Sequence, residues 1–200
     1  MTDALPGLRM LGAGGHAAVA ADAWEEAGGR ILAFHADGGG GGPADPLPIA
    51  DAIESGDMLH FAIGRNEVRR RLSQGIEDGR FPPVRHPTAI VSRSAAVSAG
   101  VLVCAAAILQ PRCRIGRHTI VNTAALVEHD CVIGDYVHIA PGVRLAGNVS
   151  IGDGAFVGIG ASVIPGIRIG ADAVVGAGAV VIRDVEPGAV VAGNPARALR

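Results

Sequence analysis

The chain has 200 residues, of which 49% are hydrophobic and 18% charged, and its formal net charge is -2. This composition is sufficient for a sizeable core in one or two domains, and it lacks the basic excess that would favour nucleic acid as a partner. The sequence contains no run of eighteen apolar residues and no basic stretch leading into an apolar one at its start, so we expect neither a membrane partner nor a secretion signal and predict a cytoplasmic protein.

The first 80 residues predict a β-loop-α-β unit. An apolar strand over 8–11 is followed by the turn GAGGH (12–16), an alanine-rich helix over about 17–27 and a second strand over 31–36. Five consecutive glycines, 38–42, predict a mobile loop.

The turn GAGGH raises the question of a ligand. Glycines between a strand and a helix let backbone N–H groups approach a phosphate, but the same turn also occurs as tight geometry without any ligand. His16 could donate a hydrogen bond to a pyrophosphate or simply cap the helix.

A third strand is predicted over 59–64, and Asn66 is placed to cap a helix over 67–79. The proline-rich stretch FPPVRHP (81–87) marks a boundary. We therefore expect a Rossmann-like α/β domain over 1–82 and a second domain over 83–200.

A six-residue period dominates the second domain. Stepping by six from Val91 to Val181 meets only Val, Ile or Leu, a register that chance would give roughly once in a billion sequences. Most of these residues are followed four positions later by a small one, such as Ala107 or Ala125. Alternating large and small inward residues predict a parallel β-helix of about five coils.

The winding of that helix comes from a resemblance. The repeat resembles that of the hexapeptide-repeat acyltransferases, which implies a coil of eighteen residues and a left-handed winding. The spacing alone gives the period and not the hand.

The three cysteines show no CxxC spacing and predict free thiols. Cys113 and Cys131 lie eighteen residues apart, so they stack in neighbouring coils. We interpret them as small core residues rather than as nucleophiles.

The stretch VEHDC (127–131) places ionisable groups among the repeats. His129 lies two residues from each of the inward Val127 and Cys131, so its ring should point out of the prism. A neighbouring carboxylate, Glu128 or Asp130, could orient the ring and increase its basicity. A solvated turn of mixed charges would show the same residues.

Gly147 follows His129 by eighteen residues and should stack against it, leaving a gap and an exposed backbone N–H. A base beside an open amide is the arrangement that acyl transfer needs, with a proton acceptor and a donor for the oxyanion. His138 precedes the inward Ile139 and is predicted to be exposed or at an interface.

Several stretches together resemble the nucleotide-sugar acetyltransferases, which include UDP-4-amino-sugar N-acetyltransferases of bacillosamine-type pathways and relatives that O-acetylate sialic acid. The similarity spans nearly the whole chain and is most specific around EHDCVIGD. The stretches are GAGGH (12–16), FAIGRNEVRRRL (61–72), HPTAIVS (86–92), NTAALVEHDCVIGDYVHIAPG (122–142), LAGNVSIGDGAFVGIGASVIPG (145–166) and VVAGNPAR (190–197).

The resemblance implies a homotrimer with acetyl-CoA between adjacent prisms and a nucleotide sugar on the N-terminal domain, with no metal. By matching position, His129 is the general base, Asp130 increases its basicity and Gly147 supplies the oxyanion amide. The residues implied to line the coenzyme slot are His138, Gly147, Ile159, Gly176 and Gly178. The residues implied to bind the nucleotide sugar are Gly14, Gly15, His16, Asp37, Gly64 and Asn122.

We therefore predict an N-acetyltransferase that acetylates the amino group of a nucleotide-linked deoxy-sugar, with UDP as the expected nucleotide. Three alternatives stay open. One is a sugar O-acetyltransferase, and another is a β-helical carbonic anhydrase with zinc held by His118, His129 and His138. The third is a protein that binds a nucleotide sugar without catalysis.

Overall fold

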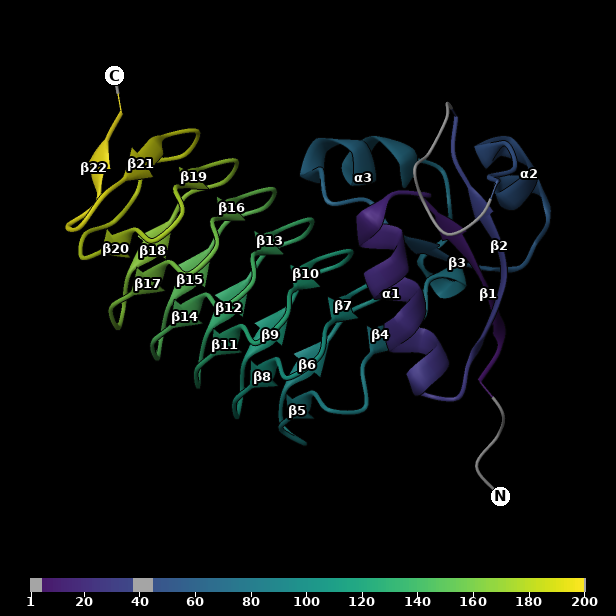
Figure 1. Ribbon diagram of the computed structural model, residues 1–200. Coiled ribbons are helices and arrows are strands. Elements are labelled where there is room, and N and C mark those ends of the chain that lie inside the picture. The colour runs from purple at the N-terminus through teal and green to yellow at the C-terminus, as the bar shows by residue number, and fades with distance from the viewer. Residues whose placement is uncertain (1–4, 38–44, 200) are drawn as a thin grey trace.

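The structure is a computed structural model that describes residues 5–37 and 45–199. An α/β unit formed by the first part of the chain lies against one end of a long prism formed by the rest (Figure 1). The glycine run 38–42, predicted as a loop, lies outside the described residues. No helix in the described part is both long and apolar enough to cross a membrane.

The α/β unit is built on a parallel sheet in the order β2-β1-β3. Its strands are β1 (Gly7–Leu11), β2 (Arg30–His35) and β3 (Met58–Phe61). Its helices are α1 (Gly15–Glu26), α2 (Ile49–Glu54), α3 (Asn66–Leu72) and the 3-10 helix η1 (Asp78–Arg80).

Helix α1 packs between this sheet and the prism. Its alanines and Trp24 share a buried cluster with Leu8 of β1 and with Leu102 and Ile120 of the prism. Small side chains suit this position because they let a helix approach β-strands closely on both sides. The alanine-rich sequence therefore fixes how the α/β unit sits on the prism.

The structure corrects three predictions in this unit. α2 was not predicted, because six residues carry too little periodicity to stand out. α3 ends at Leu72 rather than near 79, and Asn66 is its first residue instead of its cap. The Asn66 amide instead donates to the carbonyls of Gly154 (2.9 Å) and Ala155 (3.1 Å) on the prism. A tertiary contact thus replaces the local one.

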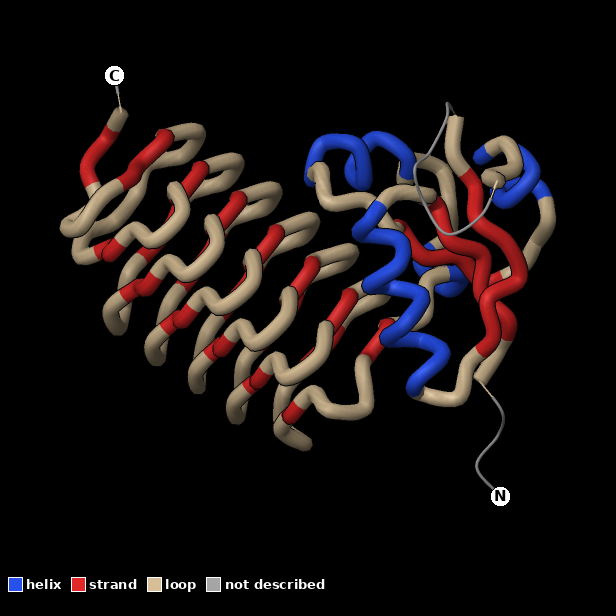
Figure 2. The backbone as a smooth tube through the Cα atoms, viewed as in Figure 1, coloured by secondary structure: helices blue, strands red, loops and turns tan. Residues whose placement is uncertain are grey.

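The prism has three faces, and each face is a sheet of short strands that pair in parallel. Figure 2 shows these strands in red, stacked coil upon coil. The first face comprises β4 (Val84–Arg85), β7 (Leu102–Val103), β10 (Ile120–Val121), β13 (His138–Ile139), β16 (Phe156–Val157), β19 (Val174–Val175), β21 (Val190–Ala192) and the antiparallel β22 (Arg197–Ala198). The second face comprises β5 (Ile90–Val91), β8 (Ile108–Leu109), β11 (Leu126–Val127), β14 (Arg144–Leu145), β17 (Ser162–Val163) and β20 (Val180–Val181). The third face comprises β6 (Ala96–Val97), β9 (Arg114–Ile115), β12 (Val132–Ile133), β15 (Ser150–Ile151) and β18 (Arg168–Ile169).

Tight turns connect the faces at three corners. We call the turn from the first face to the second the first corner, the next turn the second corner, and the turn back to the first face the third corner. Non-glycine residues with positive φ occupy many of these turns, including Arg112 (63°) and Asp130 (61°) on the second corner.

The inward residues confirm the six-residue register. The aliphatics from Val103 to Val181 lie in one continuous core with the small residues Ala107, Cys113, Ala125 and Cys131. Burying each aliphatic side chain stabilises the fold by about 1.5 to 3 kcal/mol, so the prism stands with few aromatic residues. All three cysteines are free and buried, as predicted.

The second face has six strands, so the prism has about six coils rather than the predicted five. The sequence count missed the start because Arg85 occupies the first inward register position. Paired residues such as Val127 and Leu145 are eighteen apart. The last coil is shorter, since Val175 pairs with Val191 sixteen residues on.

Helix α3 holds the α/β unit to the prism through Arg69, which is 1% exposed. Its guanidinium donates to the carbonyls of His118 (2.9 Å), Tyr136 (3.0 Å) and Val137 (3.2 Å) on the prism and to that of Ile63 (2.9 Å). Burial lowers the pKa of Arg69 to about 9, so the group stays charged at neutral pH.

Candidate active site

His129 lies on the second corner, in the turn between the inward Val127 and Cys131. Its side chain is 49% exposed, which confirms the prediction that the ring points out of the prism. Asp130 follows in the left-handed region of φ. The turn is stabilised by Asn148 on the next coil, whose N–H donates to the carbonyl of His129 at 3.0 Å.

Asp130 orients the imidazole. The Nδ1 atom of His129 lies 2.7 Å from Oδ2 of Asp130. Arg112, one coil earlier on the same corner, donates to both carboxylate oxygens of Asp130 at 2.7 and 2.8 Å. The hydrogen bonds from Arg112 and then from His129 hold the pKa of Asp130 far below its usual range. An ionised carboxylate can only accept, so Nδ1 of His129 carries the proton and Nε2 is left as a base.

Gly147 stacks on His129, as the eighteen-residue coil predicts. A Cβ added to Gly147 would lie 2.6 Å from Cε1 and 2.7 Å from Nε2 of His129, so a larger residue here would displace the ring from this position. The predicted gap is absent, because the ring fills it and Gly147 is buried. Among the hydrogen bonds of the described residues, none is donated by the Gly147 N–H. This N–H beside the ring is available to a ligand oxygen, as are those of Ala105 and Ile159 in equivalent turns.

Most residues predicted for the coenzyme slot lie on the first corner. Ile159 is 58% exposed there, and Gly176 and Gly178 occupy the next turn of the same corner. The first and second corners flank the two opposite edges of the second face. One chain therefore does not bring these residues beside His129.

His138 departs from its predicted position. It lies on the first face with 9% exposure and is turned toward the α/β unit. Its Nδ1–H donates to the carbonyl of Gly64 (3.1 Å), and its Nε2 accepts from Asn122 (3.1 Å). The ring of His16 lies 6.0 Å away between centroids. Burial lowers the pKa of His138 to about 4, so the ring is neutral at physiological pH.

The other predicted sugar-binding residues lie on the α/β unit. Gly14 and Gly15 are exposed at the start of α1, with open space where a Cβ would stand. Asp37 is exposed after β2, and its side chain accepts from the N–H of Ile49 at 3.1 Å. His16 does not cap α1 with its side chain.

A hollow of about 370 Å³ opens between the β3–α3 connection and the first face. It lies beside His138, because Gly64 lines it and Phe156 stands edge-on to the His138 ring. The sequence did not predict the charged side chains of Arg65, Glu67 and Asp172 at this site. The lining residues are Gly64, Arg65, Asn66, Glu67, Gly154, Phe156, Asp172 and Val174.

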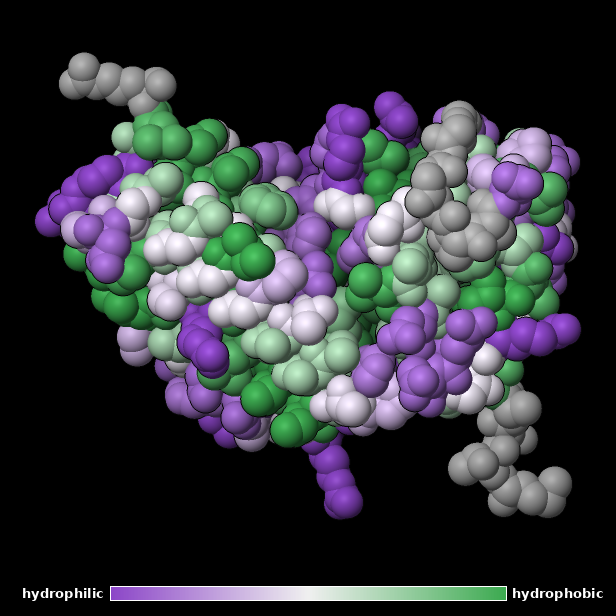
Figure 3. Space-filling model, viewed as in Figure 1, coloured by the Kyte–Doolittle hydropathy of each residue, from purple (hydrophilic) through white to green (hydrophobic). Residues whose placement is uncertain are grey.

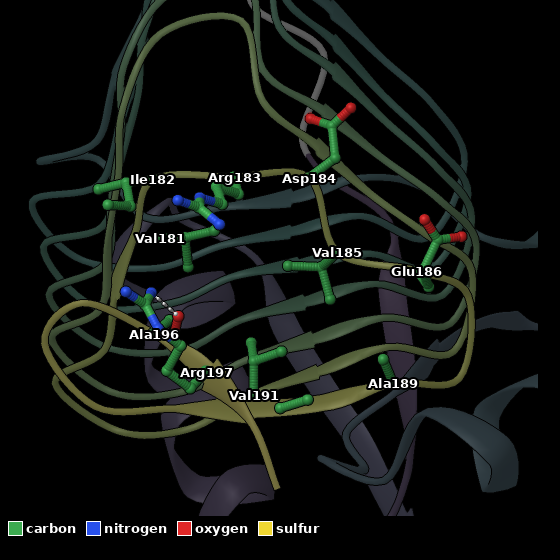
Figure 4. Close-up of a pocket in the computed structure, with 11 residues that line it drawn as sticks. Val181, Ile182, Arg183, Asp184, Val185, Glu186, Ala189, Val191, Ala196 and Arg197 are labelled. Atoms are coloured by element: carbon green, nitrogen blue, oxygen red, sulfur yellow. Dashed lines mark hydrogen bonds between the residues drawn. The ribbon is translucent and has the colours of Figure 1, made fainter.

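A second hollow, of about 240 Å³, lies at the carboxyl-terminal end of the prism (Figure 4). Val181, Val185 and Val191 form its apolar wall, and the charged side chains of Arg183 and Glu186 lie around it. It is the open mouth of the last coil.

The three histidines proposed for zinc do not face a common surface. His118 is 1% exposed, whereas His129 points outward from the second corner. Three rings of the domain interface enclose His118 at centroid distances of 4.7 to 5.4 Å, those of Phe61, Phe81 and Tyr136. The described residues contain no group of three or more metal-ligating side chains placed to hold an ion. His118 is thus unable to contribute to a zinc site at the surface.

Arg112 belongs to the site although the sequence did not suggest it. The signal was present, since Arg112 precedes Asp130 by one coil of eighteen residues. Charge complementarity along the corner would have indicated the pair.

Comparison with known protein families identifies the repeats of the prism. The family described as bacterial transferase hexapeptide (six repeats) matches residues 112–147 and 148–183. No curated protein sequence matches the chain.

Solved structures match the whole chain. PerB from Caulobacter crescentus, in complex with CoA and GDP-perosamine, is 37% identical with a TM-score of 0.91, and the match covers 98% of this chain and 99% of PerB. The H-to-A mutant of GDP-perosamine N-acetyl transferase from the same organism, also with CoA and GDP-perosamine, gives 35% identity, a TM-score of 0.91 and 98% of both chains. The acetyltransferase domain of PglB from Neisseria gonorrhoeae, in complex with acetyl coenzyme A, is 34% identical with a TM-score of 0.89. The match covers 97% of this chain and 99% of that domain.

The left-handed β-helix and its histidine corner, with these matches, define an acyltransferase of the hexapeptide-repeat class. The chain belongs to the nucleotide-sugar N-acetyltransferase family, whose members depend on acetyl-CoA. The family, the fold class and the coenzyme predicted from the sequence are confirmed.

Proposed function

We propose that this enzyme transfers the acetyl group of acetyl-CoA directly to the amino group of a nucleotide-linked amino-deoxy-sugar, with His129 as general base. The observation that carries the proposal is the contact of one half-exposed imidazole with both the Asp130 carboxylate and Gly147. This combination offers a basic Nε2 beside an unpaired backbone N–H.

The step proceeds without an acyl-enzyme. The neutral amine of the sugar attacks the thioester carbon, and the carbonyl oxygen becomes an oxyanion that accepts from the Gly147 N–H. Nε2 of His129 takes the proton from the attacking nitrogen. As the C–S bond breaks, the imidazolium returns this proton to the departing thiolate, so the products are an acetamido sugar and coenzyme A.

The acceptor lies where the α/β unit meets the first face. We place the nucleotide sugar on Gly14, Gly15 and His16 and direct its sugar toward Asn122 and the hollow beside Gly64. His138 belongs to this side, because Gly64 and Asn122 hold it in place. Asp37 stays a candidate for the nucleoside. UDP was predicted from the sequence, and GDP joins it because PerB was crystallised with GDP-perosamine.

A homotrimer completes the site. The second face carries outward aliphatic residues at its start, with Ile90 62% exposed and Ile108 and Leu126 following along the same face. Figure 3 shows hydrophobic (green) surface over β5 and β8. If second faces meet around a threefold axis, the second corner of one copy opposes the first corner of the next. Acetyl-CoA then lies between Gly147 of one copy and Ile159, Gly176 and Gly178 of another.

We also propose a cytoplasmic location, as predicted from the sequence.

The test is thiol release from acetyl-CoA with UDP-, GDP- and dTDP-linked amino sugars and their hydroxyl counterparts. His129→Ala should lower kcat/KM on the best acceptor by about 10² or more, the usual contribution of a general base. His86→Ala is the matched histidine control and should leave the rate unchanged. A loss below tenfold in His129→Ala would rule out its role.

The acceptor panel separates the remaining alternatives. Faster turnover of a sugar hydroxyl than of its amine would show an O-acetyltransferase. Binding of a nucleotide sugar without thiol release for any acceptor would show a non-catalytic protein.

A further inference from the structure

Arg112 and Asp130 form a two-point ion pair across neighbouring coils of the second corner. The guanidinium Nε and Nη2 atoms contact separate carboxylate oxygens at 2.7 and 2.8 Å. The pair is accessible, with side-chain exposures of 64% for Arg112 and 32% for Asp130. A bidentate pair of this kind holds the carboxylate in one orientation as well as stabilising it.

The backbone conformation of Arg112 does not set it apart, since Ala106, Ala124 and Asn148 also have a positive φ in equivalent turns. What distinguishes Arg112 is its side chain, which among the described residues forms hydrogen bonds with Asp130 alone.

The Oδ2 atom of Asp130 is shared. It accepts from Arg112 and from Nδ1 of His129, at 2.8 and 2.7 Å. Because Arg112 also donates to Oδ1, rotation of the carboxylate away from the imidazole would break this second hydrogen bond. Arg112 thus orients Asp130, which within residues 5–37 and 45–199 is the one carboxylate bonded to the ring.

We propose that Arg112 is a positioning residue that acts through Asp130 to hold the His129 ring with Nε2 toward Gly147 and to restrain its basicity. The inference rests on the proposed function of His129 as base. A guanidinium beside the carboxylate partly offsets its negative charge, so the imidazolium is stabilised less than by a lone carboxylate.

The charged groups nearest His129 include Glu128, which accepts the His129 backbone N–H at 3.2 Å, together with Asp130 and Arg112. Arg114 lines the same hollow as Arg112 and Asp130. Burial raises the pKa of the Cys131 thiol, which keeps it neutral. The next coil presents Gly147, without charge. Removing Arg112 therefore removes the cation that is hydrogen-bonded to Asp130.

The experiment compares Arg112→Gly, which suits the positive φ, and Arg112→Lys with the wild type. Arg114→Ala is the matched control, since Arg114 is exposed two residues on and pairs with no carboxylate among the described residues. The readouts are the NMR titration of the His129 ring, assigned with His129→Ala, and the pH profile of kcat/KM.

In Arg112→Gly we expect the His129 titration and the acidic limb of the profile to move to higher pH together, by about half a pH unit, because the site is partly screened by water. The plateau should fall about tenfold as the ring loses its fixed direction. Arg112→Lys should keep the wild-type titration, since the charge stays, and should show the lower plateau, because a lysine lacks the two-point grip.

An unchanged titration and plateau in Arg112→Gly overturns the inference, as does a rate loss without any movement of the titration, which would indicate a structural role. The titration is read without substrate. If His129→Ala proves fully active, the proposed base fails, whereas an inactive His129→Ala with a normal Arg112→Gly removes only the inference.

Discussion

At the scale of single residues, four imidazoles between the two parts of the molecule, three of them buried and that of His16 partly buried, make its stability sensitive to acid. Burial is the largest cause that lowers the pKa of His60 to about 3 and those of His16, His118 and His138 to about 4. Both ring nitrogens of His60 lack a hydrogen-bond partner in the structure. The folded state therefore keeps these rings neutral.

Acid destabilises the fold because the unfolded chain binds more protons than the folded protein. In the unfolded chain a histidine binds its proton near pH 6.5, while the folded protein binds it only near pH 4 or below, so unfolding takes up protons between these values. The free energy of unfolding keeps the whole contribution of these neutral rings above pH 6.5. It should fall by several kcal/mol toward pH 4.5, since each pKa unit is worth about 1.4 kcal/mol per group.

His60→Leu should remove one of these groups without leaving a partner unpaired. We expect equal or higher stability at pH 7.5 and an acid-unfolding midpoint about half a pH unit lower, measured by circular dichroism. His129→Leu, at the exposed corner, should leave the midpoint unchanged. An identical midpoint in His60→Leu would contradict the prediction.

At the scale of elements, α3 depends on Arg69 more than on its own helical propensity. Arg69→Ala would leave the carbonyls of Ile63, His118 and Tyr136 without this donor. Buried acceptors without donors, together with the lost volume, should cost about 3 to 5 kcal/mol in urea unfolding. Arg71→Ala, exposed on the same helix, should change stability by less than about 0.5 kcal/mol. Similar losses in both variants would show that Arg69 does not anchor the helix.

The elements also show what the sequence could predict. Each coil consists of three six-residue units and pairs with the coil eighteen residues away. A local pattern therefore suffices to predict the prism and the stacking of Gly147 on His129. His138 occupies the same outward register as exposed residues of other coils. It is buried because the α/β unit covers it, and no repeat encodes that contact.

At the scale of the whole molecule, the proposed trimer divides each site between two copies. A His129→Ala chain lacks the base, and an Ile159→Arg chain blocks the coenzyme slot on the opposite corner. If sites form between copies, random co-assembly of the two inactive chains should restore about a quarter of wild-type activity, because a site needs one intact corner from each type.

The controls for this mixture are the two variants assembled separately, which should stay inactive, and the assembly mass, which should be three times the chain mass of 20.1 kDa. A mixture that gains no activity from well-folded trimers would place both corners of the site on one chain.

At the far end of the prism, the antiparallel strand β22 pairs with the last parallel strand of the first face, β21. Stacked parallel coils end on an edge strand that could template another chain. Here β22 turns back along β21, with Val191 opposite Ala198 and Ala192 opposite Arg197. A strand of reversed direction thus covers the last edge of the first face, where a further parallel coil would otherwise pair.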